Sequence, residues 1–474
     1  MSTTRKIAHN TLIQIIGKVV STLLGLFAIG ILTRYLGTEQ FGWYTTAISF
    51  LQFVGILIDF GMTPVSAQML SEVDTNKQER LFQNLLGFRF VSAIIFLGIA
   101  PLVALAFPYP PQVKIAIAFM SISFLAIAMN QVFVGFYQKH LAMHLQVMGE
   151  FINRVALVMG LWLFISYGAG FLPLMGVVTL ASVTYMVALW LFATKLARPT
   201  FAFDWPIWKS IMIKMWPIAI SIIFNVVYLR GDLLILSIYF SQSAVGIYGA
   251  AYRVIDILTQ TAMMLMGVIL PLLTYSWSRK LTQKFSQQFQ QAFDGMMLFA
   301  LPMTVGTMVL SEKIMVLVAG PEFAASGAPL RILALTVFAV YISAIYGHTA
   351  VAINKQKQTM WVYMSCAVIT LILYLTLIPR LGMAAAAWLT VFSEIYVAIF
   401  LTLTVSKYIE HRLQLKTFWK ILVATTVMGM VVYSVQALPV LLVVLIGALI
   451  YGVLLLGMRA VSKETIREIL SVKN

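Results

Sequence analysis

The sequence predicts an all-α, polytopic membrane protein with about 14 transmembrane helices. Fourteen apolar stretches follow one another along the 474 residues, separated by short loops, and basic residues concentrate in every second loop. Hydrophobic residues make up 61% of the chain and charged residues only 10%, against roughly 25% charged residues in an ordinary soluble domain. A bilayer crossing needs about 20 apolar residues. Because its backbone groups must be hydrogen-bonded within the segment, each crossing is expected to be a helix.

The start of each apolar stretch places the predicted crossings along the chain. They begin near Leu12, Phe41, Phe82, Gln112, His144, Phe171, Ile211, Val245, Gln290, Ala328, Thr359, Gly382, Ile421 and Val440. Leu438 and Pro439 divide a final apolar run of about 37 residues, which is too long for one crossing and predicts a hairpin. Without that hairpin the count is twelve. Arg5 and Lys6 precede the first stretch, but it is too long for a signal peptide and no small-residue cleavage site follows, so a helix is expected.

Basic residues predict the orientation of the chain. Of the 32 Lys and Arg residues, twenty-two lie at the termini or in even-numbered loops and five in odd-numbered loops. By the positive-inside rule, both termini are expected to be cytoplasmic and the chain to lie in the cell (inner or cytoplasmic) membrane. The net charge of +16 then serves topology and contact with anionic membrane lipids. Nucleic acid is not an expected partner, because the basic residues are scattered over many short loops.

The sequence gives no indication of a metal, a cofactor or an intrachain disulfide. Cys366 is the only cysteine, so no disulfide can form within the chain. His140 and His144 have the i, i+4 spacing of a metal-binding pair, but no carboxylate or thiol follows within a turn, which favours an interfacial loop. The glycines from Gly320 to Gly327 lack the Lys and Ser or Thr of a phosphate-binding loop.

A weak internal repeat relates two halves of the chain. Shifting the sequence by 204 residues aligns residues 31–44 with 235–248 and matches five of 14 positions. Parallel repeats in transporters are related by an axis along the membrane normal, with the substrate cavity between them. We therefore predict an N-terminal six-helix bundle over 1–200, a second six-helix bundle over 201–415, and an extra helix pair with a cytoplasmic tail over 416–474.

Polar residues recur at helical spacing on one face of four predicted helices. The faces are Thr11, Gln14, Lys18, Ser21 and Gly25 in the first helix, Thr45, Ser49, Gln52 and Asp59 in the second, Ser221, Asn225, Tyr228 and Asp232 in the seventh, and Arg253, Asp256 and Gln260 in the eighth. The 204-residue shift relates the first two helices to the last two. We therefore expect these faces to line the interior, where a polar ligand needs them because unpaired charge is costly in a bilayer.

Eleven ionisable residues fall inside the predicted helices, and their net charge is slightly negative. They are Lys18, Arg89, Arg154, Arg230, Arg253, Asp59, Glu150, Asp232, Asp256, Asp294 and Glu394. Three pairs are expected from spacing within one helix or similar depth on consecutive antiparallel helices: Glu150 with Arg154, Arg253 with Asp256, and Lys18 with Asp59. Static salt bridges between helices are the alternative to a role in transport.

The other intramembrane charges have different interpretations. Arg230 and Asp232 are two residues apart, so they point to nearly opposite sides of their helix. Arg89 and Asp294 lie near cytoplasmic helix ends, where snorkelling to the interface explains them. Glu394 has no obvious partner, and a carboxylate near mid-membrane is a candidate for proton or sodium coupling or for pairing with an unrecognised partner.

Five short motifs occur in order over most of the first 405 residues. They are residues 34–44 (RYLGTEQFGWY), Asp59-Phe60-Gly61, Val245-Gly246-Ile247-Tyr248 through Arg253, Gly320-Pro321-Glu322-Phe323, and Ile378-Pro379-Arg380-Leu381-Gly382 before an alanine-rich helix. Together they resemble the oligosaccharide and polysaccharide flippases of the multidrug, oligosaccharidyl-lipid and polysaccharide exporter superfamily. The family's usual Arg shortly after Asp-x-Gly is absent, with Gln68 and Met69 in that region, so no role is assigned to that position.

The resemblance implies a flippase that uses alternating access to move a lipid-linked oligosaccharide from the cytoplasmic to the outer leaflet for surface polysaccharide synthesis. The carrier in this family is usually undecaprenyl diphosphate, which cations would stabilise. The candidate substrate-binding residues are Arg230, Arg253, Lys18, Asn225, Gln52 and Arg154, and the candidate gating or coupling residues are Asp59, Glu150, Asp232, Asp256 and Glu394. Polymerase and other polysaccharide-assembly proteins are further candidate partners.

Two other functions are weighed against this one. An ion-coupled drug or small-molecule exporter of the same superfamily would be favoured if acidic residues alone lined the cavity, and Arg230 and Arg253 argue against it. A membrane glycosyl polymerase or ligase would need a sizeable extracytoplasmic loop. The longest odd-numbered loop, around Ser311 to Gly327, holds fewer than about 20 residues. The chain is therefore not expected to be an enzyme.

Overall fold

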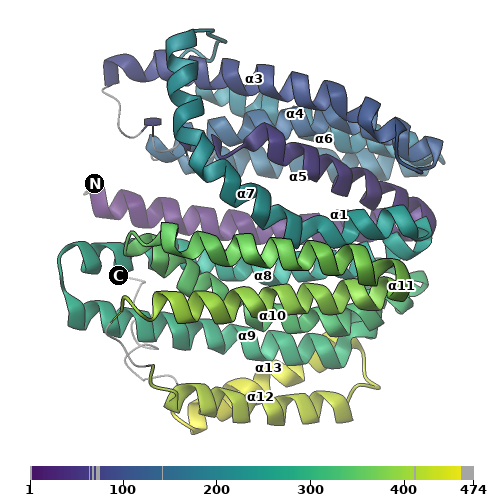
Figure 1. Ribbon diagram of the computed structural model, residues 1–474. Coiled ribbons are helices and arrows are strands. Elements are labelled where there is room, and N and C mark those ends of the chain that lie inside the picture. Colours follow the sequence, from purple (N-terminus) through teal and green to yellow (C-terminus); the bar gives the residue numbers. More distant parts are fainter. Residues whose placement is uncertain are drawn as a thin grey trace. The chain divides into compact units, whose positions relative to one another are not determined.

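The computed structural model describes residues 3–62, 65–66, 69–70, 75–140, 142–409 and 413–460, with side chains described from Gly17 onward except at 75–77, 217–218 and 220–222. Within these ranges it contains twelve α-helices, one short 3-10 helix and no strand (Figure 1). Eleven of the described helices are long and apolar enough to cross a membrane. The predicted all-α, polytopic membrane fold is confirmed.

Two long helices, α1 (Thr3–Asp59) and α11 (Gln356–Val405), are each interrupted by one glycine. A helix of 50 residues would extend about 75 Å, far more than the roughly 30 Å of the hydrocarbon core. Gly37 in α1 has a φ of 65° and Gly382 in α11 has a φ of 64°, a left-handed conformation that glycine adopts without steric cost. Each helix therefore supplies two of the predicted crossings, divided at its glycine.

The remaining elements follow the predicted segments. They are α3 (Thr75–Leu105), α4 (Pro111–Lys139), α5 (Met143–Ser166), α6 (Phe171–Ala193), α7 (Trp205–Tyr239), α8 (Gln242–Ser278), α9 (Thr282–Ala319), the 3-10 helix η1 (Pro321–Ser326), α10 (Gly327–Ala352), α12 (Lys416–Ser434) and α13 (Val440–Gly457). The connection between α12 and α13 contains Leu438 and Pro439, which confirms the predicted hairpin.

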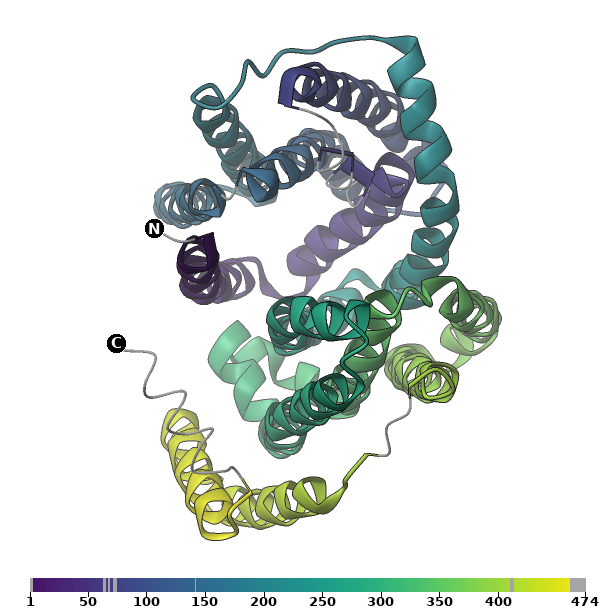
Figure 2. The same ribbon diagram turned by 90° about the vertical axis from the view of Figure 1, so that its left-hand side faces the viewer.

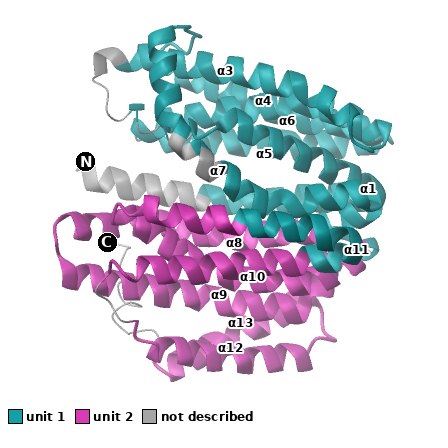
Figure 3. Ribbon diagram, in the orientation of Figure 1, with its two compact units in different colours: residues 1–249, 318–322, 367–386 teal, residues 250–317, 323–366, 387–474 magenta. Residues whose placement is uncertain are grey.

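Contacts divide the chain into two compact units, coloured teal and magenta in Figure 3. Unit 1 comprises Met1–Gly249, Val318–Glu322 and Ala367–Ala386. Within it, α4 packs against α3 and α6, and α5 packs against α1 and α6. Figure 2 shows several of these helices nearly end-on. In the apolar core of unit 1, the rings of Phe82 and Phe136 stack with centroids 4.1 Å apart and join α3 to α4.

Unit 2 comprises Ala250–Leu317, Phe323–Cys366 and Ala387–Asn474. In this unit α12 packs against α13, and an apolar cluster that includes Leu310 and Met428 joins α9 to α12. Many large apolar side chains of the transmembrane helices are exposed, as expected of surfaces that face lipid. The units group helices by contact and not by internal repeat, so the division at residues 200 and 415 remains a prediction.

The connection between α6 and α7 lies along α3. Gln83 of α3 donates a side-chain hydrogen bond to the Arg198 carbonyl (3.0 Å), and its own carbonyl accepts from the Ala202 amide (3.1 Å). Two residues after Ala202, the Asp204 amide donates to Asn84 Oδ1 (2.8 Å). These bonds fix where α7 starts, and α7 carries one wall of the site described next.

Candidate functional site

The second half of α1 ends in a backbone turn that is unusual for its residues. Phe60 has a φ of 41° and Gly61 a φ of 81°, so the chain leaves helical geometry directly after Asp59. A non-glycine residue with positive φ is uncommon and is held only where its surroundings support it. The side chain of Arg89, from α3, contacts the backbone at this turn.

Arg89 joins three helices of unit 1. Its Nη1 donates to the Ile58 carbonyl (3.0 Å), and its Nη2 donates to Asp59 Oδ1 (2.7 Å) and to Gln131 Oε1 of α4 (2.7 Å). The side chain of Arg89 is fully buried. A buried charge is tolerated when it is paired and hydrogen-bonded, and Arg89 meets both conditions.

A cavity of about 320 Å³ lies beside this cluster, and we call it the unit 1 cavity. Residues of α1, α3, α4 and α7 line it: Gln52, Gly55, Ile56, Ile58, Asp59, Arg89, Phe124, Ile127, Ala128, Gln131, Val226, Leu229 and Arg230. Its size is at the lower end of pockets that hold small ligands, so it can accept one group of a large substrate.

The ionisable residues that line the unit 1 cavity carry a net positive charge. They are the guanidinium groups of Arg89 and Arg230 and the carboxylate of Asp59, which sum to +1. Guanidinium groups bind phosphate and carboxylate through paired hydrogen bonds. The local charge therefore favours an anionic ligand, although the charge summed over all predicted helices does not.

Two of the predicted ion pairs are wrong. Lys18 Nζ lies 3.5 Å from Glu150 Oε1 of α5, and Asp59 pairs with Arg89, so Lys18 and Asp59 do not form the expected pair. The reason is that α1 packs its first half against α5, whereas Asp59 faces α3. Among the described residues, no ion pair joins Glu150 to Arg154. Arg154 lies instead beside α1, at the level of Gly25.

The predicted pair of Arg253 and Asp256 is confirmed in unit 2. Arg253 Nη1 lies 3.8 Å from Asp256 Oδ2, one turn along α8. Glu394 of α11 is buried in the same unit, and no ion pair to it is found among the described residues.

The polar face of α7 is used in two ways. Arg230 lines the unit 1 cavity, whereas Asp232 is buried and accepts a hydrogen bond from Tyr248 Oη of α8 (2.7 Å). Asn225, which lies five residues before Arg230, donates from its Nδ2 to Tyr228 Oη (2.9 Å). Of the predicted substrate-binding residues, Gln52 and Arg230 therefore share one cavity. Lys18 and Arg154 belong to the α1–α5 contact, and Arg253 lies in unit 2.

Two glycines related by the 204-residue shift make matching close contacts in unit 1. A Cβ on Gly42 would lie 1.7 Å from the Gln242 carbonyl oxygen, and a Cβ on Gly246 would lie 2.0 Å from the Thr38 carbonyl oxygen. The shift carries Gly42 onto Gly246 and Thr38 onto Gln242. A two-fold relation between repeats produces such reciprocal contacts.

Further contacts join the same two segments. Thr45 and Gly249, which are also related by the shift, touch each other, since a Cβ on Gly249 would lie 2.4 Å from Thr45 Cγ2. Ser243 Oγ donates to Thr38 Oγ1 (2.8 Å). Small residues let two helices approach closely within a membrane, so we call residues 38–46 with 242–249 the glycine crossing.

A neighbouring contact explains two of the sequence motifs. Arg34 Nη1 donates to the Val318 carbonyl (2.9 Å) and to the Gly30 carbonyl (3.0 Å). Gly320, with a φ of 102°, lies against the Arg34 side chain. The motif that begins at Arg34 and the motif that begins at Gly320 are thus parts of one contact in unit 1.

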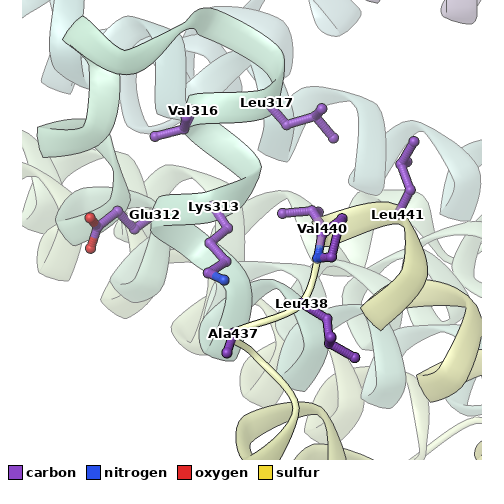
Figure 4. Close-up of a pocket in the computed structure, with 9 residues that line it drawn as sticks. Glu312, Lys313, Val316, Leu317, Ala437, Leu438, Val440 and Leu441 are labelled. Atoms are coloured by element: carbon purple, nitrogen blue, oxygen red, sulfur yellow. The ribbon is translucent and has the colours of Figure 1, made fainter.

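Unit 2 contains a larger cavity of a different kind. It measures about 560 Å³ and lies between the end of α9 and the α12–α13 turn. Lys313 donates to the Gln436 carbonyl, and in Figure 4 Glu312 points away from Lys313 and the turn. The remaining lining residues, such as Val316 and Leu441, are apolar. Its polar groups are few, so the unit 1 cavity is the better site for a charged headgroup.

Sequence reasoning missed Arg89 and Gln131. We expected Arg89 to snorkel from a helix end, yet it is fully buried. Arg89 is preceded by fourteen residues of α3, whereas the predicted helix starts near Phe82, only seven residues before Arg89. Residues 75–80 are polar, so the apolar pattern alone placed Arg89 near a helix end. Gln131 carries no comparable signal, because a single amide in an apolar helix is not distinctive.

Comparison with known proteins gives matches in sequence and in fold. Residues 7–277 match the family described as "Polysaccharide biosynthesis protein". A probable low-salt glycan biosynthesis flippase, Agl15 of Haloferax volcanii, is 26% identical over 207 residues. That alignment covers 44% of this chain and 44% of Agl15, so the chain matches less than half the length of this curated relative.

Solved structures share the fold at low sequence identity. Lipid II flippase MurJ in an inward closed conformation superposes with a TM-score of 0.77 at 15% identity, over 94% of this chain and 97% of MurJ. An inward-facing multidrug resistance MATE transporter of the MOP superfamily gives a TM-score of 0.68 at 13% identity, over 82% of this chain and 94% of the transporter. These proteins and Agl15 are described as flippases or transporters and not as enzymes.

Proposed function

Because this chain belongs to the polysaccharide biosynthesis protein family, we propose that it is a flippase for a polyprenyl-diphosphate-linked oligosaccharide. In this proposal the substrate moves from the cytoplasmic to the outer leaflet of the cell membrane, for surface polysaccharide synthesis. Both termini are cytoplasmic, and the polymerase and other assembly proteins receive the product. The similarity to the glycan flippase Agl15 supports the substrate class.

The unit 1 cavity is the observation that carries this proposal. It combines a net charge of +1 with amide side chains and an apolar wall. The diphosphate of the carrier is a strong hydrogen-bond acceptor, and Arg230 supplies donors that match it. Gln52 and Gln131 offer neutral hydrogen-bonding groups for the adjoining sugar hydroxyls.

Alternating access would move the substrate between leaflets. The glycine crossing brings together residues 38–46 and 242–249, which lie at predicted extracytoplasmic helix ends. We propose that the crossing closes the outer side of the pathway in this conformation and opens when the substrate leaves. Glu394 is our candidate for coupling this change to proton or sodium movement, because its buried position disfavours a permanent charge.

An ion-coupled drug or small-molecule exporter is the second candidate function, and the fold shared with a MATE transporter supports it. Exporters of cations need acidic groups in their cavity. The unit 1 cavity has two guanidinium groups and one carboxylate, which favours the flippase.

Reconstitution into proteoliposomes tests the proposal. A lipid-linked oligosaccharide is placed in the inner leaflet, and an impermeant glycosidase in the outer solution reports its arrival. We expect cleavage beyond the outer-leaflet fraction only with the wild-type protein and only with a diphosphate-linked sugar. Transport of cationic dyes, with no movement of any lipid-linked sugar, would identify the exporter instead.

A further inference from the structure

We propose that Arg89 is a positioning residue that makes the unit 1 cavity selective for an anionic group. The inference rests on the proposed function, since it names how the cavity favours a diphosphate. Arg89 borders the cavity but has no exposed surface. A ligand in the cavity would therefore contact the residues that Arg89 holds and not its guanidinium group.

Arg89 acts on three hydrogen-bond acceptors. Its guanidinium group donates to the Ile58 carbonyl, to the Asp59 carboxylate and to the Gln131 amide oxygen, at 2.7 to 3.0 Å. All three residues line the cavity. An acceptor that faces a phosphate oxygen repels it, and a hydrogen bond from a cation reduces that repulsion. By hydrogen-bonding these three acceptors, Arg89 thus reduces the repulsion between the cavity wall and a bound anion.

The charge of the cavity depends on Arg89 in the same way. With Arg89 the ionisable lining residues sum to +1, and without it Asp59 and Arg230 sum to zero. Burial lowers the local dielectric, so a change of one unit charge acts strongly on a charged ligand. Replacing Asp59 by asparagine in the absence of Arg89 returns the sum to +1, and this makes the proposal testable by a pair of changes.

The experiment measures equilibrium binding of radiolabelled undecaprenyl diphosphate to the full chain in nanodiscs, with undecaprenol as the uncharged probe. We expect Arg89→Met to weaken diphosphate binding by about tenfold, or about 1.4 kcal/mol, and to leave undecaprenol binding within about twofold of wild type. Arg89→Met combined with Asp59→Asn should recover diphosphate binding to within about threefold of wild type, because the cavity regains its positive charge. Arg198→Met is the matched control, since Arg198 is an exposed arginine of unit 1 outside the cavity.

The outcomes separate this inference from the proposed function. If the wild type binds both probes equally, the proposed function fails. If the wild type prefers the diphosphate and Arg89→Met does too, only the inference fails. A merely structural role would weaken binding of both probes together and would also overturn it. If Arg89→Met cannot be purified, the double variant decides, because a double variant that folds but has lost the preference contradicts the inference.

Discussion

At the scale of single residues, the contact between Lys18 and Glu150 is expected to hold α1 against α5. The two charged atoms lie 3.5 Å apart, and the side chains are 33% and 16% exposed. Glu150→Gln leaves the Lys18 ammonium without its counter-ion. Because both groups are partly exposed, the loss should be about 1 kcal/mol and not the roughly 3 to 5 kcal/mol of a fully buried pair. The thermal unfolding midpoint in detergent measures it.

The charge swap serves as the control for this pair. Lys18→Glu combined with Glu150→Lys should recover most of the lost stability, since the attraction is restored with its sign reversed. If the swap is less stable than Lys18→Glu alone and than Glu150→Lys alone, the two losses add and the residues act independently.

Arg230 gives the second prediction at this scale. Arg230→Ala should abolish surface polysaccharide while protein level stays near normal, because Arg230 lines the unit 1 cavity and its loss removes substrate stabilisation. Arg230→Lys should retain part of the export, since it keeps the charge and loses the paired donors. Surface polysaccharide is measured in a deletion strain that carries each variant.

Lys209→Ala is the matched control for Arg230, because Lys209 is an exposed cation on the same helix. Normal export with Arg230→Ala, or equal loss in both variants, would reject the binding role.

The sequence could predict which residues are charged within the membrane but only part of how they pair. The pair of Arg253 and Asp256 followed from spacing on one helix. The partners of Lys18 and Asp59 depend on which neighbouring helix each part of α1 packs against, and the polar face of a helix does not identify that neighbour. Arg89 is a stronger example, because its three acceptors come from three separate residues on two other helices.

At the scale of elements, the glycine crossing should not tolerate a side chain. Gly42→Ala would place a Cβ 1.7 Å from the Gln242 carbonyl oxygen, so one helix must move. Overpacking of this kind costs about 1 to 3 kcal/mol. We expect a lower unfolding midpoint and a loss of transport, because the predicted extracytoplasmic ends can no longer meet.

Gly176→Ala in α6 provides the comparison, since no atom lies within 4 Å of its added Cβ. That variant should match or exceed the wild type in stability, as alanine favours a helix by about 1 kcal/mol. Equal behaviour of the two variants would contradict the close approach at Gly42.

The positions of the elements were largely predictable. Apolar runs of about 20 residues place each crossing, and the structure divides α1 and α11 at Gly37 and Gly382, near the predicted boundaries. The internal repeat aligned the two segments of the glycine crossing in sequence but did not predict their contact. Five matches in 14 positions relate Gly42 to Gly246 in sequence. They do not predict that Gly42 contacts Gln242 and that Gly246 contacts Thr38, because these contacts depend on how the two segments pack.

At the scale of the whole molecule, the orientation in the membrane can be tested with cysteine labelling. The 22 to five distribution of basic residues predicts that η1 is extracytoplasmic. Ala325 is exposed in η1, whereas the neighbouring Ser326 is fully buried and would be a poor probe. In a background with Cys366→Ser, a cysteine replacing Ala325 should react with an impermeant thiol reagent in intact cells or spheroplasts.

Gln283→Cys is the partner measurement, because Gln283 is exposed at the start of α9, on the predicted cytoplasmic side. It should react only after lysis. Labelling in the reverse order would invert the assigned topology, and labelling of both in intact cells would discredit the crossing count between them.

The connection between α6 and α7 has a practical consequence for anyone who wishes to divide the chain or insert a reporter. A protease site within residues 198–204 would break bonds to Gln83 and Asn84 and release the start of α7. The loop between α5 and α6 carries an exposed hydrogen bond from Tyr35 Oη to the Ala169 carbonyl (2.9 Å), so an insertion belongs just before Ala169. There Tyr167 is 82% exposed, and Gly168 has no atom within 4 Å of an added Cβ. The longer connection is thus part of the scaffold, and the short loop is the one with room for engineering.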